Sequence, residues 1–135
     1  MLFFKKICKK INKKFFIAND IELAFKYRLD GVYLPSFNKI HQLKKFQNFN
    51  NFTIIGSAHS IMEIRTKEKQ NVKQIFLSPI FQTNKSKKKL GIIKFNNLSK
   101  FTKIPLIALG GINQNNIKQL NLININGFAG ISYFN

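Results

Sequence analysis

The feature of this sequence that most constrains its fold is a series of short apolar runs, each of which ends in small or polar residues. The runs are continuously apolar rather than alternating, which is typical of strands that are buried on both faces. Six of them occur, at Phe15–Ala18, Gly31–Leu34, Phe52–Gly56, Gln74–Leu77, Pro105–Leu109 and Gly127–Ile131. The sequence therefore predicts about six buried strands.

The segments between these runs have helical spacing. Apolar side chains recur three to four residues apart at Ile21, Ala24, Phe25 and Leu29, and again over residues 117–123. A strand reaches a parallel neighbour only through a crossover connection, so the alternation predicts a parallel sheet with covering helices. The 135 residues, 44% of them hydrophobic, suffice for one domain with a core. We expect a single α/β domain over residues 1–135.

Residues 2–13 predict a basic amphipathic helix before the first strand. Phe3 or Phe4, Ile7 and Ile11 keep the helical spacing, with lysines between them. The favoured interpretation is that this helix covers the sheet. The alternative is that it lies on a membrane or a partner.

The chain is strongly basic, with 23 Lys and Arg against 5 Asp and Glu and a formal net charge of +18. Nucleic-acid binding, a phosphorylated small substrate, and drift towards Lys, Asn, Ile and Phe codons are three possible reasons. Apart from Lys5–Lys14 and Lys85–Lys89 the basic residues are dispersed, and aromatic residues do not interleave with these lysine runs. Drift is the favoured reason, because the sequence is also rich in Asn and Ile, which serve no electrostatic purpose. The pattern disfavours nucleic acid as a partner and leaves small phosphorylated substrates open.

Cys8 is the only cysteine, so the sequence offers no disulfide and no cluster of thiolates. The apolar run at the N-terminus is too short for a signal peptide. No stretch approaches the roughly 20 apolar residues that a membrane-spanning helix needs. We expect a cytoplasmic protein with no membrane association.

Ligands of parallel α/β folds bind at the carboxyl ends of the strands, so the residues after each apolar run are the candidate site. They are polar or small: Asn19-Asp20, Pro35-Ser36, Ser57 to Ser60, Ser78-Pro79, Gly110-Gly111 and Ser132. These residues predict one polar rim.

Two positions on this rim have a functional and a structural interpretation. Gly110-Gly111, together with Gly130 to Ser132, could let backbone N–H groups approach a phosphate, or could only make a tight turn. Asp20 could bind Mg²⁺, or could cap the helix that begins at Ile21. The residues alone leave both choices open.

The same holds for the imidazole and for the lysine run. His59 could act as an acid or base, or could be a hydrogen-bonded rim residue. Lys85 and Lys87–Lys89 could clamp a diphosphate from a mobile loop, Gln82–Lys89, or could simply be solvated.

Read in order, the motifs of this chain resemble those of the thiamine-phosphate synthase and TenI-like family. The matching segments follow the family order over most of the chain: Ile17-Ala18-Asn19-Asp20, Asp30 to Ser36, Ile55 to Ser60, Phe76 to Thr83, Leu90-Gly91 and Ile107 to Asn113.

The resemblance implies a TIM-type barrel that couples a hydroxymethylpyrimidine diphosphate to a thiazole phosphate and releases pyrophosphate, with Mg²⁺ as cofactor. It implies Ser57 and His59 as candidate catalytic residues and Asp20 as the metal ligand. The residues that it implies for substrate binding are Asn19 and Ser57 for the diphosphate, Thr83 with Lys85 or Lys87 for closure, and Gly110, Gly111, Ile131 and Ser132 for the thiazole phosphate.

The chain departs from the family pattern in two places. Counting back from the Gly-Gly strand makes Phe15–Ala18 the third of eight strands, so we expect a partial barrel with the first two strands absent. The second metal carboxylate of the family falls at Asn38, and an amide is a poorer Mg²⁺ ligand. Six strands leave two unpaired edges, which a homo-oligomer could cover.

These departures keep two alternatives open. One is a thiazole tautomerase-like relative, in which His59 transfers a proton without a metal. The other is a non-catalytic binder of a phosphorylated ligand.

Overall fold

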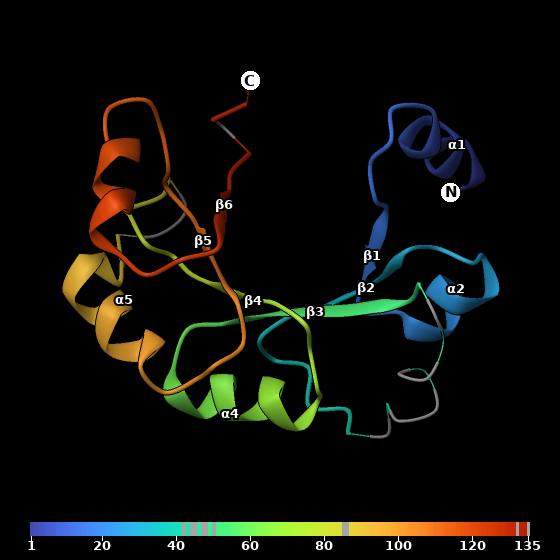
Figure 1. Cartoon of the computed structure of the whole chain (residues 1–135), viewed down its shortest axis with the longest axis horizontal. Coiled ribbons are helices and arrows are strands. Elements are labelled where there is room, and N and C mark those ends of the chain that lie inside the picture. Colours follow the sequence, from blue (N-terminus) through green and yellow to red (C-terminus); the bar gives the residue numbers. More distant parts are fainter. Residues whose placement is uncertain are drawn as a thin grey trace.

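The computed structural model describes residues 1–41, 43, 46, 49, 51–84, 87–131, 133 and 134. Within them, six parallel strands form one sheet in the order of the sequence (Figure 1). The strands are β1 (Phe16–Ala18), β2 (Gly31–Leu34), β3 (Thr53–Ala58), β4 (Ile75–Leu77), β5 (Leu106–Leu109) and β6 (Gly127–Ala129). The sheet curves like a U whose arms end at β1 and β6, so the predicted α/β partial barrel is confirmed.

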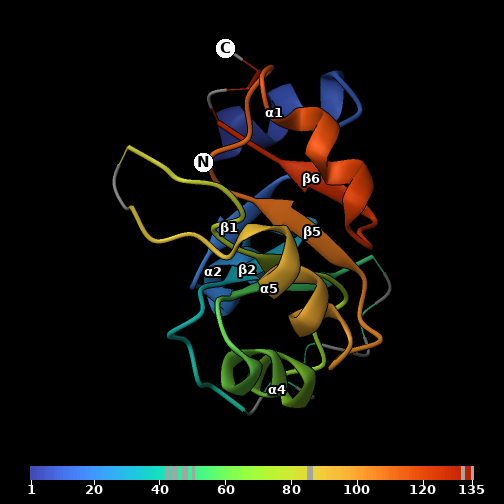
Figure 2. The same cartoon turned by 90° about the vertical axis from the view of Figure 1, so that its left-hand side faces the viewer.

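Helices follow most of the strands and lie on the outer side of the curved sheet (Figures 1 and 2). The helix α1 (Leu2–Lys10) precedes β1. Those that follow strands are α2 (Ile21–Lys26), α4 (Ile61–Lys69), α5 (Gly91–Ser99) and the 3₁₀ helix η1 (Ile117–Leu122). The last of these corresponds to the helical spacing expected over residues 117–123. Short parallel strands joined by outer helices leave the strand ends free to form a site.

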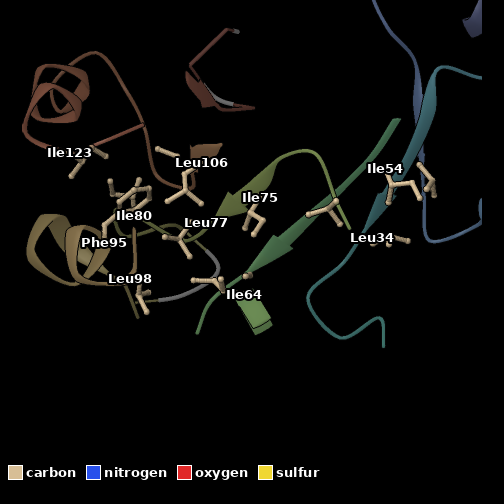
Figure 3. Close-up of a cluster of buried hydrophobic side chains, with 14 of the residues drawn as sticks. Leu34, Ile54, Ile64, Ile75, Leu77, Ile80, Phe95, Leu98, Leu106 and Ile123 are labelled. Atoms are coloured by element: carbon tan, nitrogen blue, oxygen red, sulfur yellow. The ribbon is translucent and has the colours of Figure 1, made fainter. Parts of the chain in front are cut away.

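The core fills the layer between the sheet and the outer helices, as Figure 3 shows. Strand register aligns Leu34 with Gly56, Gly56 with Ile75, and Ile75 with Leu106. Side chains at these positions point outward, where Leu34, Ile75 and Leu106 are almost wholly buried with Phe95 of α5. Alternate positions face the other side of the sheet, where Tyr33 and Phe76 make an edge-to-face contact with ring centroids 5.7 Å apart.

Left-handed residues stop three helices. Asn12, Arg28 and Asn71 have φ values of 53°, 49° and 54°, and the backbone N–H groups around them bond back to the last helical turn. Asparagine tolerates this conformation better than most residues, so part of the asparagine content has a structural use.

The N-terminal helix does not cover the sheet, and the favoured expectation for it was wrong. No residue of α1 is buried, and Phe3 is 68% exposed. Its Lys5 ammonium donates to the carbonyl oxygen of Tyr27, at the C-terminal end of α2, at 2.9 Å. β1 is an edge strand, so the described part of the chain offers no further strand on which the apolar face of α1 could pack.

The buried layer predicts a sharp contrast between two neighbours on α5. Phe95→Ala should lower the free energy of unfolding by about 3–5 kcal/mol, because its fully buried ring would leave a cavity. Ile93→Ala, at a side chain that is 80% exposed, should change it by less than about 0.5 kcal/mol. Urea unfolding of both variants measures the difference, and equal losses would contradict this account of the core.

Candidate functional site

The carboxyl ends of the strands meet at one rim, as predicted. Asn19 follows β1, Ser78 follows β4, and Gly110 and Gly130 follow β5 and β6. β3 extends two residues beyond the predicted strand, because Ser57 and Ala58 still pair with β4. Ser57 is therefore a buried strand residue rather than a rim residue.

A cavity of about 540 Å³ opens at the ends of β5 and β6. Its wall consists of Gln82, Thr83, Asn84, Leu109, Gly110, Gly111, Ile112, Asn113, Gly130 and Ile131. Three strand-end segments far apart in the sequence thus converge here. This volume suits a small ligand.

Close packing explains the two consecutive glycines. Gly110 and Gly111 have φ values of 98° and 71°, a region that L side chains rarely adopt. A Cβ on Gly110 would lie 2.8 Å from the Cβ of Pro79, and one on Gly111 would overlap the carbonyl oxygen of Gln82. The tight-turn interpretation therefore accounts for the glycines, and phosphate contact stays a prediction.

Asn116 holds the glycine turn in place. Its Nδ2 donates to the carbonyl oxygen of Gly111 at 2.7 Å, and its Oδ1 accepts from the N–H of Asn113 at 2.9 Å. The sequence analysis missed this residue, because nothing distinguishes it from the other asparagines around it. The role of Asn116 follows from its hydrogen bonds to the turn, and these can be seen only in the folded structure.

The structure brings some of the predicted substrate residues to this cavity. Thr83, Gly110, Gly111 and Ile131 line it. Lys87 is exposed and does not belong to its wall. The predicted roles of Lys85 and Ser132 fall outside the described residues, as does part of the Gln82–Lys89 loop.

His59 is exposed at the end of β3, and its ring is fixed by the end of β4. Its Nδ1 lies 2.7 Å from the carbonyl oxygen of Ser78 and 3.2 Å from the Ser78 hydroxyl oxygen. A carbonyl oxygen can only accept, so we assign the proton to Nδ1, which leaves Nε2 as the acceptor in the neutral ring. The arrangement fits both a rim residue and a base.

Asp20 caps α2, which confirms the structural interpretation of this residue. Its Oδ1 accepts from the N–H of Leu23 at 2.8 Å. The carboxylate is exposed, so it keeps oxygen lone pairs for another partner. Its metal role stays a prediction.

Asn38 cannot replace the second metal carboxylate. Its Oδ1 accepts 3.0 Å hydrogen bonds from the N–H of Ile40 and from Nε2 of Gln70, and its Nδ2 donates to Oδ1 of Asn19 at 2.7 Å. In the described part of the chain no three His, Cys, Asp or Glu side chains gather. These residues fit a Mg²⁺ ion that is held by Asp20, waters and substrate oxygens, rather than by a protein cage.

Lys67 has an unusual environment beneath this end of the rim. The side chain is 0% exposed, and burial lowers the pKa of its ammonium from 10.5 to about 8, against the opposing effect of the Glu63 charge. A lysine within the polar segment of α4 would be expected to lie in solvent. No local sequence pattern indicated that Lys67 is buried.

Comparison with known proteins decides the family. The sequence model described as thiamine monophosphate synthase matches residues 2–134. The chain belongs to this family. Among the described residues, no helix has the length and apolar character to cross a membrane.

Two curated relatives of this family member carry the name thiamine-phosphate synthase. The chain is 35% identical to an enzyme of Prochlorococcus marinus over 93% of its own length and 37% of the relative. It is 33% identical to the putative thiamine-phosphate synthase 2 of Aquifex aeolicus, over 95% of this chain and 69% of the relative. The chain thus spans little more than a third of the Prochlorococcus protein.

Solved structures agree on the fold. Thiamine phosphate pyrophosphorylase from Pyrococcus furiosus superposes with a TM-score of 0.76 at 22% identity, covering 94% of this chain and 61% of that one. FabK from Thermotoga maritima superposes with a TM-score of 0.73 at 17% identity, covering 97% of this chain and 45% of that one. At these identities the likeness is one of architecture.

The buried ammonium predicts a pH dependence of stability. The folded protein releases the Lys67 proton near pH 8 and the unfolded chain near 10.5, so between these values the unfolded state binds more protons. Stability should therefore rise with pH through this window, by up to roughly 3 kcal/mol from this residue. Below pH 8 both states are protonated, and the contribution is constant.

Denaturant unfolding of wild type and Lys67→Met across this window isolates the effect, because the other lysines are common to both proteins. The wild-type value should climb more steeply. Parallel profiles would contradict the lowered pKa of Lys67.

Proposed function

We propose that this chain acts in thiamine biosynthesis as a thiamine-phosphate synthase. In the proposed reaction the thiazole nitrogen attacks the methylene carbon of a hydroxymethylpyrimidine diphosphate, the carbon–oxygen bond breaks, and pyrophosphate leaves. The observation on which the proposal rests is the glycine-walled cavity at the ends of β5 and β6 in a member of this family.

The thiazole phosphate would occupy that cavity. Gly110 and Gly111 line it, and the backbone N–H groups of such a turn would be available to an anion. Thr83 adds a hydroxyl from the loop after β4. The net charge of +18 favours anionic ligands in general.

The pyrimidine diphosphate would bind towards β1 and β3. Asn19 and Asp20 follow β1 and are exposed, whereas Ser57 lies on β3 on the same face of the sheet as Tyr33 and Phe76. The amide of Asn19 would donate a hydrogen bond to a diphosphate oxygen. Nε2 of His59 would accept a proton from the pyrimidine. Bound Mg²⁺ would neutralise the negative charge of the departing pyrophosphate, and Asp20 would be its protein ligand.

A second candidate is a protein that binds the thiazole phosphate without catalysis. The observation that favours it is Asn38, whose amide oxygen accepts two hydrogen bonds from protein groups where the family resemblance places a metal carboxylate.

Calorimetric titration of the 135-residue chain with thiazole phosphate, and with pyrimidine diphosphate plus Mg²⁺, separates these candidates when a turnover assay follows in the same sample. Binding of both with turnover supports the synthase. Thiazole phosphate binding alone supports the second candidate, and binding of neither would refute both.

Asp20→Asn tests the metal ligand without loss of the helix cap. Asparagine caps a helix about as well as aspartate, so the free energy of unfolding should change little. Mg²⁺-dependent affinity for the pyrimidine diphosphate should fall by about tenfold or more, because an amide is a weaker ligand for Mg²⁺. Glu22→Gln removes a carboxylate from the same helical turn and should leave this affinity unchanged; a loss in both variants would point to net charge alone.

Ile131→Asp tests the thiazole phosphate cavity. The side chain is 84% exposed on the cavity wall, so the substitution should not disturb the core. A carboxylate there should repel the phosphate and weaken its binding by roughly tenfold, whereas the neutral Ile131→Asn should change it much less. Equal affinities of the two variants, measured at low salt, would remove the phosphate from this cavity.

A further inference from the structure

A buried polar network connects α4 to the exposed residues after β1. Its members are Lys67 of α4, Gln70 at the C-terminal cap of α4, Asn38 of the loop after β2, and Asn19 after β1. Lys67, Gln70 and Asn38 are buried, and Asn19 is exposed. The network therefore extends from the core to the rim.

The Lys67 ammonium has three acceptors and no carboxylate among them. Nζ donates to the carbonyl oxygens of Pro35 and Asn38 at 2.7 and 3.1 Å, and to Oε1 of Gln70 at 2.9 Å. An ammonium has three N–H donors, so the charged form satisfies all three acceptors. The neutral amine has only two N–H groups and would leave one acceptor facing its lone pair.

β3 makes room for this side chain through a glycine. A Cβ on Gly56 would lie 2.8 Å from Cδ of Lys67 and 3.2 Å from the carbonyl oxygen of Leu34. The aliphatic stem of Lys67 thus occupies the space that a larger residue at position 56 would fill. Gly56 and Lys67 form one complementary pair in this chain.

The ammonium and two backbone carbonyls together fix the orientation of Gln70. Lysine can only donate, so Oε1 of Gln70 must face it and Nε2 must point away. Nε2 then donates to Oδ1 of Asn38 at 3.0 Å, and also to the carbonyl oxygens of Asn38 and Ile40 at 3.0 and 2.9 Å.

Gln70 and the backbone N–H of Ile40 together fix the two asparagines. Oδ1 of Asn38 already accepts from Gln70 and Ile40, so Nδ2 of Asn38 faces Asn19 and donates to its Oδ1 at 2.7 Å. Oδ1 of Asn19 therefore faces inward, and its NH₂ group remains for an acceptor outside the network. An exposed N–H donor beside Asp20 matches an anionic oxygen ligand.

We propose that Lys67 is a positioning residue for the diphosphate end of the site, which orients the Asn19 amide through Gln70 and Asn38 so that its NH₂ group faces a phosphate oxygen. The inference rests on the proposed function. It adds two residues of α4, Lys67 and Gln70, that contact no substrate and act on binding only through Asn38 and Asn19.

The test is titration of inorganic pyrophosphate with Mg²⁺, and separately of thiazole phosphate, into wild type, Lys67→Met and Gln70→Met. Methionine keeps most of the buried volume of either residue and removes its hydrogen bonds. Both variants should bind pyrophosphate about tenfold more weakly, as expected for one misdirected hydrogen bond to a charged group, with thiazole phosphate affinity unchanged. Gln70→Met does so without a change in net charge, and it supplies the test if Lys67→Met fails to fold.

Lys69→Met is the matched control. It removes the same charge from the exposed side of α4 two residues away, and it should leave both affinities as in wild type. A loss of pyrophosphate binding in this control equal to that in Lys67→Met would overturn positioning in favour of a general charge effect.

Amide NMR provides a readout that loss of stability does not move. In wild type the side-chain NH₂ signals of Asn19 should shift on addition of pyrophosphate, and in Gln70→Met this shift should disappear while thiazole phosphate still perturbs Gly110 and Gly111. Retention of the Asn19 shift in the variant would overturn the proposal.

The outcomes separate the two levels of the argument. If wild type binds neither ligand, the proposed function fails. If wild type binds both ligands, two results would refute positioning by Lys67 and leave the proposed function standing. In one, Lys67→Met and Gln70→Met keep their affinity for both ligands; in the other, they lose affinity for both ligands equally. If wild type binds thiazole phosphate but no pyrophosphate, there is no diphosphate for Asn19 to receive, and the positioning role is refuted as well.

Discussion

Parallel pairing of six short strands is the constraint on which the rest of this structure depends. Because each strand runs in the same direction as its neighbours, every chain crossing must return along the outer face of the sheet, and every carboxyl end arrives at the same rim. The outer layer then receives the helices and most of the apolar side chains. The rim receives the short polar segments, which is why residues as distant as Asn19 and Gly130 belong to one end of the molecule.

The two ends of the candidate site are built by different physics. At β5 and β6 the wall includes a glycine turn that packs against Pro79 and Gln82 and is held by the Asn116 amide. At β1 and β2 it is a hydrogen-bond network that begins at a buried ammonium whose three hydrogen-bond acceptors are neutral oxygens. Such a charge is costly to bury and is tolerated because all three of its donors are satisfied.

The two edges of the sheet and the N-terminal helix are less well packed than the core. Within the described residues, the strands β1 and β6 each pair on one side only, and α1 exposes its apolar residues to solvent. A basic amphipathic sequence is equally compatible with a helix on a sheet and a helix without one, since the spacing of its apolar residues is the same in both cases. Which of the two holds depends on what lies next to β1.

The sequence by itself determined the strands, their parallel order and the rim, because continuous apolar runs and small terminal residues are local signals. It placed Gly110, Gly111 and Asp20 at strand ends and Thr83 in the loop after β4, and the cap by Asp20 was among its alternatives. Only the tertiary structure decided that Ser57 is buried within β3, that Asn116 fastens the glycine turn, and that Lys67 is a core residue. Burial of a lysine depends on acceptors 29 and 32 residues away in the chain, and no local pattern encodes partners at that distance.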